Sequence, residues 1–204
     1  MADIETRSRR EEYADTTRAA LLDAACALFV AGGYSQVGVE AISRAARVTR
    51  GAFYHHFADK PALFEALVIR LQAEALAKVS AASAKLTDPA DRLKAGSAAF
   101  LDICVELSYR RLVIEDAPAI LGTARCREIE EGSVIGVMIA ALMARHEAGR
   151  FDPPDPRLAA RMIVSMLCET AIELPAATNP DRMRRDALET VDRVLAAFDP
   201  TTRA

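Results

Sequence analysis

The segment TRGAFYHHFADK, at residues 49–60, gathers residue types that proteins use to bind nucleic acid. It holds three aromatic rings, two adjacent histidines and two basic residues, with a glycine near its start. Cations and histidines suit phosphate, and an arginine can read the edges of bases. Residues 41–60 carry four Lys/Arg against a single Asp, whereas the whole chain of 204 residues has a net charge of −3. A local basic footprint on a mildly acidic body indicates a protein that touches phosphate with one end.

Three predicted helices place this segment. The chain is rich in Ala, Leu and Arg and sparse in Gly and Pro, so we predict an all-α fold. Residues 17–32 have the apolar spacing of an amphipathic helix, and residues 39–46 and 50–56 form two short helices around a turn at 47–49. This is the pattern of a helix-turn-helix unit, whose second short helix enters the DNA major groove. On spacing alone, ordinary packing of three helices is the competing interpretation. The expected internal contact involves Ala41, Ala45 or Ala46, Val48 and Phe53.

The rest of the chain divides at proline and glycine breaks. We expect a flexible arm over residues 1–14, a helix-turn-helix domain over 15–60 with a connecting helix over 59–86, and a ligand-binding and dimerisation domain over 87–204. Asp59 is expected to cap the connecting helix. About nine helices are predicted in total; those beyond the break lie near 89–108, 109–116, 124–148, 156–174 and 180–198, with a turn at Ala117-Pro118.

The segment from residue 17 to about residue 74 resembles the DNA-binding domain of the tetracycline-repressor (TetR) family. The resemblance runs through TRAALLDAACALFVAGGY and VEAISRAARVTRGAFYHHFADKPALFEAL. It implies a homodimeric transcriptional regulator, usually a repressor, that binds a palindromic operator in double-stranded DNA and is released by a small-molecule effector. A transcriptional activator of the same fold and a helical protein-interaction adaptor are the alternatives.

The resemblance also implies roles for individual residues. Arg50 would read guanine, Gly51 would let the backbone approach the DNA, and Ala52 would touch a thymine methyl group. Thr17 and Thr49 would begin helices that meet phosphate, and Lys60 would reach back to phosphate. Phe53 and Phe57 are expected to be core anchors. The expected DNA contacts are Thr17, Arg44, Arg47, Thr49, Arg50, Gly51, Ala52, Tyr54, His55, His56 and Lys60.

Two positions depart from the usual pattern of that family. Members often have Ser or Thr where Gly38 begins the second helix and Thr where Val37 stands, so a hydroxyl-to-phosphate contact is lost here. The turn often holds Gly where Arg47 stands. If that position requires a positive φ, Arg47 carries modest backbone strain.

The second half of the chain is expected to hold a ligand pocket, as the resemblance implies. Plain core packing is the competing interpretation for each candidate. Glu169, four residues before Glu173, could attract a cationic ligand, pair with an arginine across an interface, or lie at a solvated edge. The candidate pocket residues are Phe100, Cys104, Leu107, Tyr109, Met138, Leu142, Met166 and Glu169.

The last two predicted helices carry long apolar stripes that indicate a dimer interface. TetR-like proteins dimerise through a four-helix bundle of this kind, and two-fold symmetry would require a palindromic operator. Simple core packing within one subunit is the alternative. The expected interface residues are Leu158, Met162, Met166, Leu188, Val191, Val194, Leu195 and Phe198.

Several other classes of protein lack support in the sequence. No Ser/His/Asp set, phosphate loop or metal-binding spacing is present, so we expect no enzyme activity, no cofactor and no metal. The four cysteines lie far apart in apolar helical contexts and are expected to be small buried hydrophobes. No apolar stretch reaches membrane-spanning length and the N-terminus lacks a signal sequence, so we expect a cytoplasmic protein.

Overall fold

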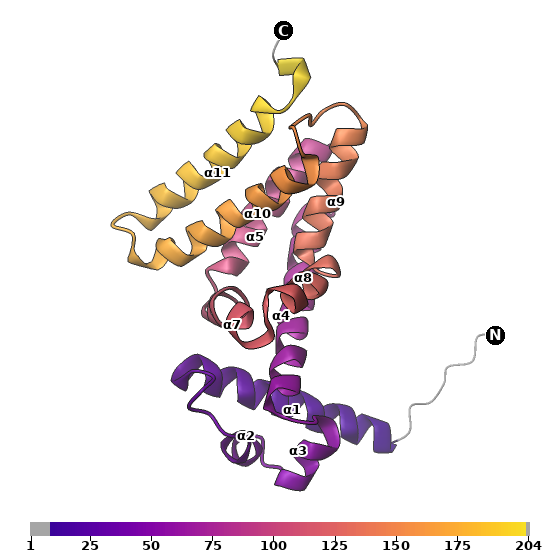
Figure 1. Ribbon diagram of the computed structural model, residues 1–204, viewed down its shortest axis with the longest axis vertical. Coiled ribbons are helices and arrows are strands. Elements are labelled where there is room, and N and C mark those ends of the chain that lie inside the picture. The colour runs from indigo at the N-terminus through magenta and orange to yellow at the C-terminus, as the bar shows by residue number, and fades with distance from the viewer. Residues whose placement is uncertain (1–8, 203–204) are drawn as a thin grey trace, which may run out of the picture. The chain divides into compact units, whose positions relative to one another are not determined.

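The computed structural model describes residues 9–202, and this part of the chain is helical without any strand, which confirms the predicted all-α class (Figure 1). Every helix within it is too short or too polar to cross a lipid bilayer. The chain forms two compact units, Met1–Val68 and Ile69–Ala204. The division falls inside a helix, α4 (Lys60–Ser83), rather than at the predicted break near residue 87.

The first unit contains α1 (Arg9–Gly32), α2 (Val39–Ala45), α3 (Arg50–His56) and the start of α4. Both short helices and their separation are as predicted. The beginning of α1 is not, because the helix starts at Arg9 and includes residues 9–14 of the expected flexible arm. Residues 1–8 of that arm lie outside the described part. Asp59 caps α4 as expected, its Oδ1 accepting from the amide of Ala62 at 2.8 Å.

The core of the first unit is built on phenylalanines. Phe29 of α1 and Phe64 of α4 meet edge to face, with ring centroids 5.8 Å apart, and both side chains are fully buried. Of the expected internal contact, Phe53 is fully buried and Ala46 and Val48 are half-buried, but two of the alanines are wrong. Ala41 and Ala45 are exposed, whereas α2 buries Ile42 and Ser43. A β-branched side chain of larger area therefore holds α2 in place.

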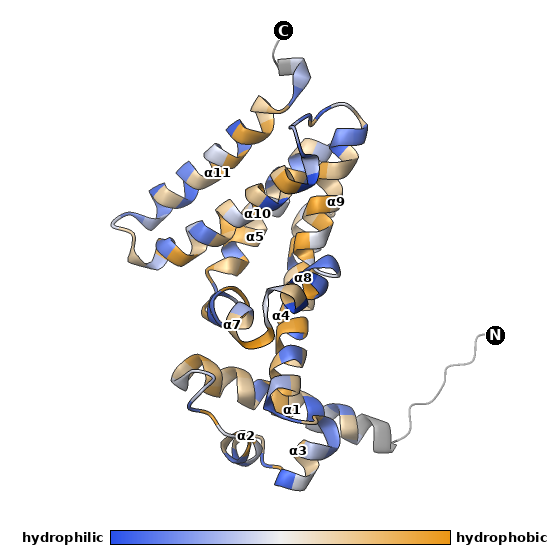
Figure 2. Ribbon diagram, in the orientation of Figure 1, coloured by the Kyte–Doolittle hydropathy of each residue, from blue (hydrophilic) through white to orange (hydrophobic). Residues whose placement is uncertain are grey.

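The second unit is a helical bundle whose last two helices form a hairpin. Figure 1 shows α10 (orange) and α11 (yellow) side by side and joined by a short turn, and the two helices are in contact. In Figure 2, α11 alternates between hydrophilic and hydrophobic residues, as expected of a surface helix. The elements are α5 (Pro89–Cys104), α6 (Leu107–Tyr109), the π-helical segment η1 (Arg110–Asp116), α7 (Ala117–Leu121), α8 (Thr123–Glu131), α9 (Val134–Glu147), α10 (Pro156–Glu173), the 3-10 turn η2 (Leu174–Ala176), α11 (Pro180–Ala197) and the 3-10 turn η3 (Pro200–Thr202).

The predicted single helix over residues 124–148 is wrong, because the chain breaks at Gly132 and Ser133 between α8 and α9. The Ser133 hydroxyl donates to the carbonyl of Glu130 at 2.7 Å and accepts from the amide of Ile135 at 3.2 Å. Ser133 thus caps α9 while closing α8. The predicted turn at Ala117-Pro118 is also wrong. Both residues lie in α7, which follows η1 without a break.

A tight approach at this break yields a prediction about Gly136. A Cβ added there would clash with the carbonyl oxygen of Glu131 and lie 2.9 Å from that of Glu130. We expect Gly136→Ala to lower the free energy of unfolding by about 2 kcal/mol, since backbone must move, as measured by urea denaturation. Gly132→Ala is the matched control, because its Cβ would have an ordinary contact at 3.9 Å. Equal stability of the two variants would contradict this interpretation.

Candidate nucleic-acid interface

Helix α3 is held from below by two buried rings. Phe53 is fully buried and Phe57, at the C-cap, is 4% exposed, with ring centroids 5.9 Å apart. Thr49 caps the other end, its Oγ1 accepting from the amide of Ala52 at 3.1 Å. Both aromatic anchors and the Thr49 helix start are therefore as predicted. The hydroxyl of Thr49 satisfies its own helix, while the side chains of α3 opposite the rings remain outside the core.

The first turn of α3 carries Arg50, whose side chain is fully exposed. Its guanidinium lies 5.6 Å from the centroid of the Tyr54 ring, and its Nη2 donates to the Tyr54 hydroxyl at 3.5 Å. This hydrogen bond raises the pKa of Arg50, so the side chain is a permanent cation. The stacking holds a planar fork of donors at the N-terminal end of a helix, which is the geometry that pairs with guanine in the major groove.

The turn between α2 and α3 depends on a left-handed residue. Arg47 has φ 57°, the one positive φ among the described non-glycine residues, which confirms the strain expected at this position. The conformation lets the chain reverse direction so that the amide of Val48 donates to the carbonyl of Ser43 at 2.9 Å. Arg47 is exposed, so its charge projects to solvent beside the start of α3.

Lys60 has a structural role that the sequence did not suggest. Its ammonium donates to the backbone carbonyls of Tyr34 and Val37, both at 3.1 Å, and lies 4.1 Å from the centroid of the Tyr34 ring. Two of its three protons are thus committed to the connector between α1 and α2. These contacts give Lys60 a structural role, and the expected phosphate contact stays a prediction that rests on the third proton.

Thr17 is a correction. Because α1 begins at Arg9, Thr17 lies inside the helix, and its hydroxyl donates to the carbonyl of Tyr13 at 2.9 Å. The side chain is buried and does not begin a helix, so it offers no donor to phosphate. The sequence analysis missed the neighbouring Arg18, whose guanidinium lies 5.2 Å from the centroid of the Phe57 ring. The signal available in the sequence was that Arg18, a basic residue, directly follows Thr17, which was itself expected to contact DNA.

The two histidines at the end of α3 differ. His55 is exposed and His56 is half-buried, with ring centroids 5.3 Å apart. Burial, followed by the neighbouring His55 and Arg18, lowers the pKa of His56, so its ring is neutral near pH 7. Neutral His56 can donate one hydrogen bond to an anion without bringing a charge.

The structure therefore brings most of the expected DNA contacts to one exposed helix-turn-helix surface. On α2, Arg44 is exposed and pairs with Glu40 at 3.2 Å, an exposed pair that is easily given up to a phosphate. Gly38 caps α2 without a side-chain hydrogen bond, as expected. The exposed members are Arg44, Arg47, Thr49, Arg50, Gly51, Tyr54 and His55, whereas Ala52, His56 and Lys60 are half-buried and Thr17 is buried.

The expected pocket residues do not gather around one cavity. Cys104 accepts or donates a hydrogen bond with Cys168, which together with burial raises the pKa of the Cys104 thiol. The Tyr109 hydroxyl donates to Gln72 at 2.8 Å, and burial raises its pKa. Leu107 is a correction, because it begins α6 with 53% of its area exposed. Phe100, Cys104, Tyr109, Met138 and Leu142 lie in the core of the second unit.

Two grooves open on the second unit. The first, called the α5–α9 groove below, has a volume of about 480 Å³, lies between α4, α5 and α9 and includes Met138 from the predicted pocket. The other is wide open, about 710 Å³, and lies between α10 and α11, where Met166 and Glu169 contribute to its lining. The four cysteines are all free thiols, and only Cys104 is fully buried.

The expected interface residues fall into two groups. Leu158 and Met162 of α10 are 54% and 60% exposed, unusual values for large apolar side chains. Val191 is a correction, since it is 1% exposed and its face of α11 is used within the subunit. Phe198 also packs within its own subunit, with its ring centroid 5.7 Å from that of Phe151. Half-buried members are Met166, Leu188, Val194, Leu195 and Phe198.

Comparison with known proteins covers both units. Residues 21–67 match the family model "Bacterial regulatory proteins, tetR family", and residues 90–198 match "Tetracyclin repressor-like, C-terminal domain". The chain is 26% identical over 156 residues to the transposon Tn10 TetC protein of Escherichia coli, covering 73% of this chain and 77% of that protein. It is 39% identical over 70 residues to the HTH-type transcriptional repressor Rv1474c of Mycobacterium tuberculosis, covering 34% and 37%. A solved TetR-family regulator from Pectobacterium atrosepticum is 26% identical, with a TM-score of 0.69 over 95% of this chain and 98% of that chain.

The left-handed turn leads to a prediction about stability. Glycine adopts φ 57° without the steric cost that Arg47 bears, so Arg47→Gly should raise the free energy of unfolding by about 0.5–1 kcal/mol. Arg44→Gly is the opposite control, since an exposed position in α2 should lose about 1 kcal/mol. Urea denaturation measures both. A loss of stability in Arg47→Gly would show that the arginine side chain contributes more than its backbone strain costs.

Proposed function

The chain belongs to the TetR family of DNA-binding transcriptional regulators, and from that premise we propose that it is a homodimeric repressor released from a palindromic operator by a small molecule. The observation that carries the DNA-binding half of this proposal is the first turn of α3. There Arg50, Gly51 and Ala52 stand above the buried anchor Phe53, free of the core.

In the proposed complex, α3 lies in the major groove with its N-terminal end toward the bases. Arg50 donates to guanine, and the side chains around it contact phosphate: Arg44 from α2, Arg47 from the turn, and Tyr54 and His55 from α3. Lys60 contributes indirectly, because its two carbonyl contacts hold the connector between α1 and α2 in place. The repressor role is supported by the likeness to Rv1474c, which is named a transcriptional repressor.

Dimerisation is proposed through α10 and α11. Leu158 and Met162 expose large apolar area on one side of α10, four residues apart and therefore on one helical face. Burying such a face against its symmetry mate removes it from water on both subunits. A two-fold axis would then present two copies of α3 to two half-sites, which is why the operator is expected to be palindromic.

The DNA assignment is tested by comparing binding to two duplexes. The first is a palindromic site recovered by selection with the purified protein, and the second is a scrambled duplex of equal length and composition. Arg50→Ala should reduce the preference for the selected site about tenfold or more, since one bidentate base contact is lost per subunit. Fluorescence anisotropy at several salt concentrations measures the effect.

Arg44→Ala is the matched control for that experiment. It should weaken binding to both duplexes alike and reduce the slope of log affinity against log salt by about one per subunit, because it removes a phosphate contact. If wild-type protein shows no preference between the duplexes, the proposed function is wrong. If both variants lose affinity equally on both duplexes, the division of roles between Arg50 and Arg44 is wrong.

The dimer assignment is tested by placing a charge on the exposed face. Met162→Glu should convert the dimer to a monomer, because the carboxylate would be buried without a partner in a symmetric interface. Sedimentation equilibrium measures the mass. Leu107→Glu is the control, since Leu107 is as exposed as Leu158 but lies on α6. A Met162→Glu protein that stays dimeric would place the interface elsewhere.

A further inference from the structure

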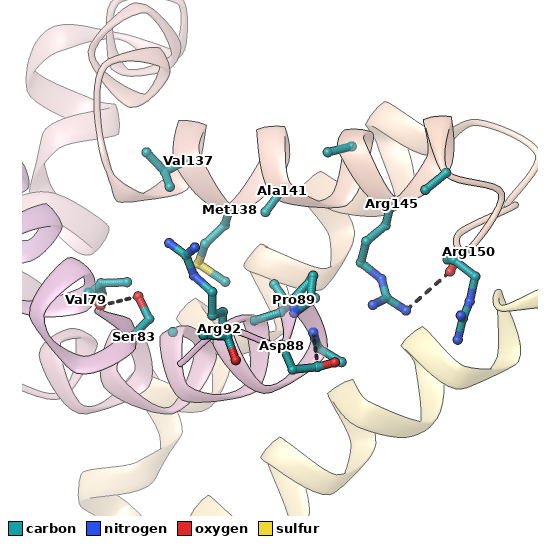
Figure 3. Close-up of a pocket in the computed structure, with 16 residues that line it drawn as sticks. Val79, Ser83, Asp88, Pro89, Arg92, Val137, Met138, Ala141, Arg145 and Arg150 are labelled. Carbon is teal, nitrogen blue, oxygen red and sulfur yellow. Dashed lines mark hydrogen bonds between the residues drawn. The ribbon is translucent and has the colours of Figure 1, made fainter. Parts of the chain in front are cut away.

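The α5–α9 groove of the second unit has the size of a small-molecule site, and more arginines than carboxylates line it. Figure 3 shows it between α5 below and α9 above, with Arg92 and Arg145 extending toward it from opposite helices. Its volume of about 480 Å³ lies within the range of small-molecule sites. Small side chains create the space, because the α9 face that lines the groove is largely alanine. The alanines of this lining are Ala90, Ala141, Ala144 and Ala148.

Arg92 brings a charge that nothing in the described structure neutralises. Its side chain leaves α5 and runs to a position beside Met138 of α9 (Figure 3). Within residues 13–201 it has no ion-pair partner, although most arginines of this unit do, among them Arg110, Arg161 and Arg184. A cation beside a thioether and methyl groups is a recognition element for an anion that also has an apolar part.

Arg145 brings an unsatisfied donor. Its Nη2 donates to the carbonyl of Arg150 at 3.4 Å and lies 3.5 Å from Asp199 Oδ2. Its Nε is buried and lacks a hydrogen-bond partner among the described residues. A buried donor of a charged group left without an acceptor costs free energy, so an acceptor at this place would be bound favourably.

The two carboxylates nearby are already engaged. Asp88 lines the groove, but its Oδ1 caps α5 by accepting from the amides of Ala90 and Asp91 at 2.8 and 3.0 Å. Asp199 accepts from Arg150 Nε at 3.0 Å and from the Thr201 hydroxyl at 2.7 Å. Neither carboxylate pairs with Arg92. The groove therefore carries an unneutralised positive charge, that of Arg92, next to its apolar residues.

We propose that this groove binds an organic anion with a compact apolar body. A carboxylate or similar head group faces Arg92, and the apolar body lies along Val79, Met138 and Ala141. This assigns the ligand class to a surface other than the α10–α11 groove, where Glu169 would favour a cation. Calling this anion the effector rests on the proposed function; its binding does not.

The experiment uses three probes of nearly equal shape and different charge: 1-naphthoate, 1-naphthalenemethanol and 1-naphthylmethylammonium. Isothermal titration calorimetry with the full chain should show naphthoate binding at least about tenfold more tightly than the alcohol, with the ammonium weakest. Arg92→Gln should weaken naphthoate about tenfold and leave the alcohol unchanged. Arg127→Gln, an exposed arginine of α8 that lines neither groove, should leave all three unchanged.

A second variant tests the location without touching a charge. Ala141→Leu places a larger side chain on an exposed position of α9 at the groove, so it should abolish binding while circular dichroism and the melting temperature stay near wild type. Binding of the alcohol or the ammonium as tight as that of naphthoate would overturn the proposal. So would an Arg92→Gln affinity within about twofold of wild type, or the absence of naphthoate binding at about 1 mM.

The same samples separate this proposal from the proposed function. Operator binding is measured by anisotropy with and without saturating naphthoate. Naphthoate that binds in the groove but leaves operator affinity unchanged would count against the ligand response and leave the anion site standing. A protein that prefers its operator but fails every calorimetric criterion would overturn the anion site and leave DNA recognition standing.

Discussion

A helix of seven residues is too short to persist in water by itself, and the segment that carries Arg50 is such a helix. Its stability comes from Phe53 and Phe57, whose burial contributes roughly 1.5–3 kcal/mol per ring. The rest of the first unit likewise depends on buried side chains that stabilise short helices. Helix α2 is anchored by the buried Ile42, and Phe29 of α1 meets Phe64 of α4 in the core of the same unit. DNA-facing residues are left with the opposite side of α3, where no core contact restricts their type.

The turn and the connector fix the direction of α3 by different means. At the turn, Arg47 has an unfavourable backbone conformation, which allows the amide of Val48 to donate a hydrogen bond to the carbonyl of Ser43. At the connector, Lys60 supplies donors to two carbonyls that no helix could satisfy. Both positions hold a basic residue that helps to determine the local backbone conformation. Their positive charge nevertheless adds to the potential of the same unit, so a structural lysine and a DNA-facing arginine look alike in a count of basic residues.

That ambiguity marks the limit of what the sequence could predict. The all-α class, the two short helices, the caps at Thr49 and Asp59 and the positive φ of Arg47 follow from local propensities or from the resemblance, and the structure has them. Thr17 was misassigned because the helix begins earlier and its hydroxyl donates to a carbonyl one turn away. The structural role of Lys60 was missed because its two carbonyl partners lie in a distant loop. The break at Gly132 was missed because a single glycine does not oblige a helix to end, whereas the Ser133 hydroxyl beside it does so here. Arg92 was missed because its lack of an ion-pair partner is a tertiary property.

Helix α4 is the stretch of chain through which the two units are covalently joined, so it must take part in any coupling that travels along the backbone. Its second half is tied to the second unit by the Tyr109–Gln72 hydrogen bond and by Lys78, which lies 2.6 Å from Glu106. It also lines the α5–α9 groove through Val79 and Ser83. A ligand there can shift DNA affinity only if it binds two arrangements of α4 unequally, and a hundredfold change in operator affinity needs about 2.7 kcal/mol of such difference. The buried Tyr109–Gln72 bond resists displacement, whereas the exposed Lys78–Glu106 pair gives way readily. A ligand that drives α4 to move is therefore expected to break the Lys78–Glu106 pair before the Tyr109–Gln72 bond.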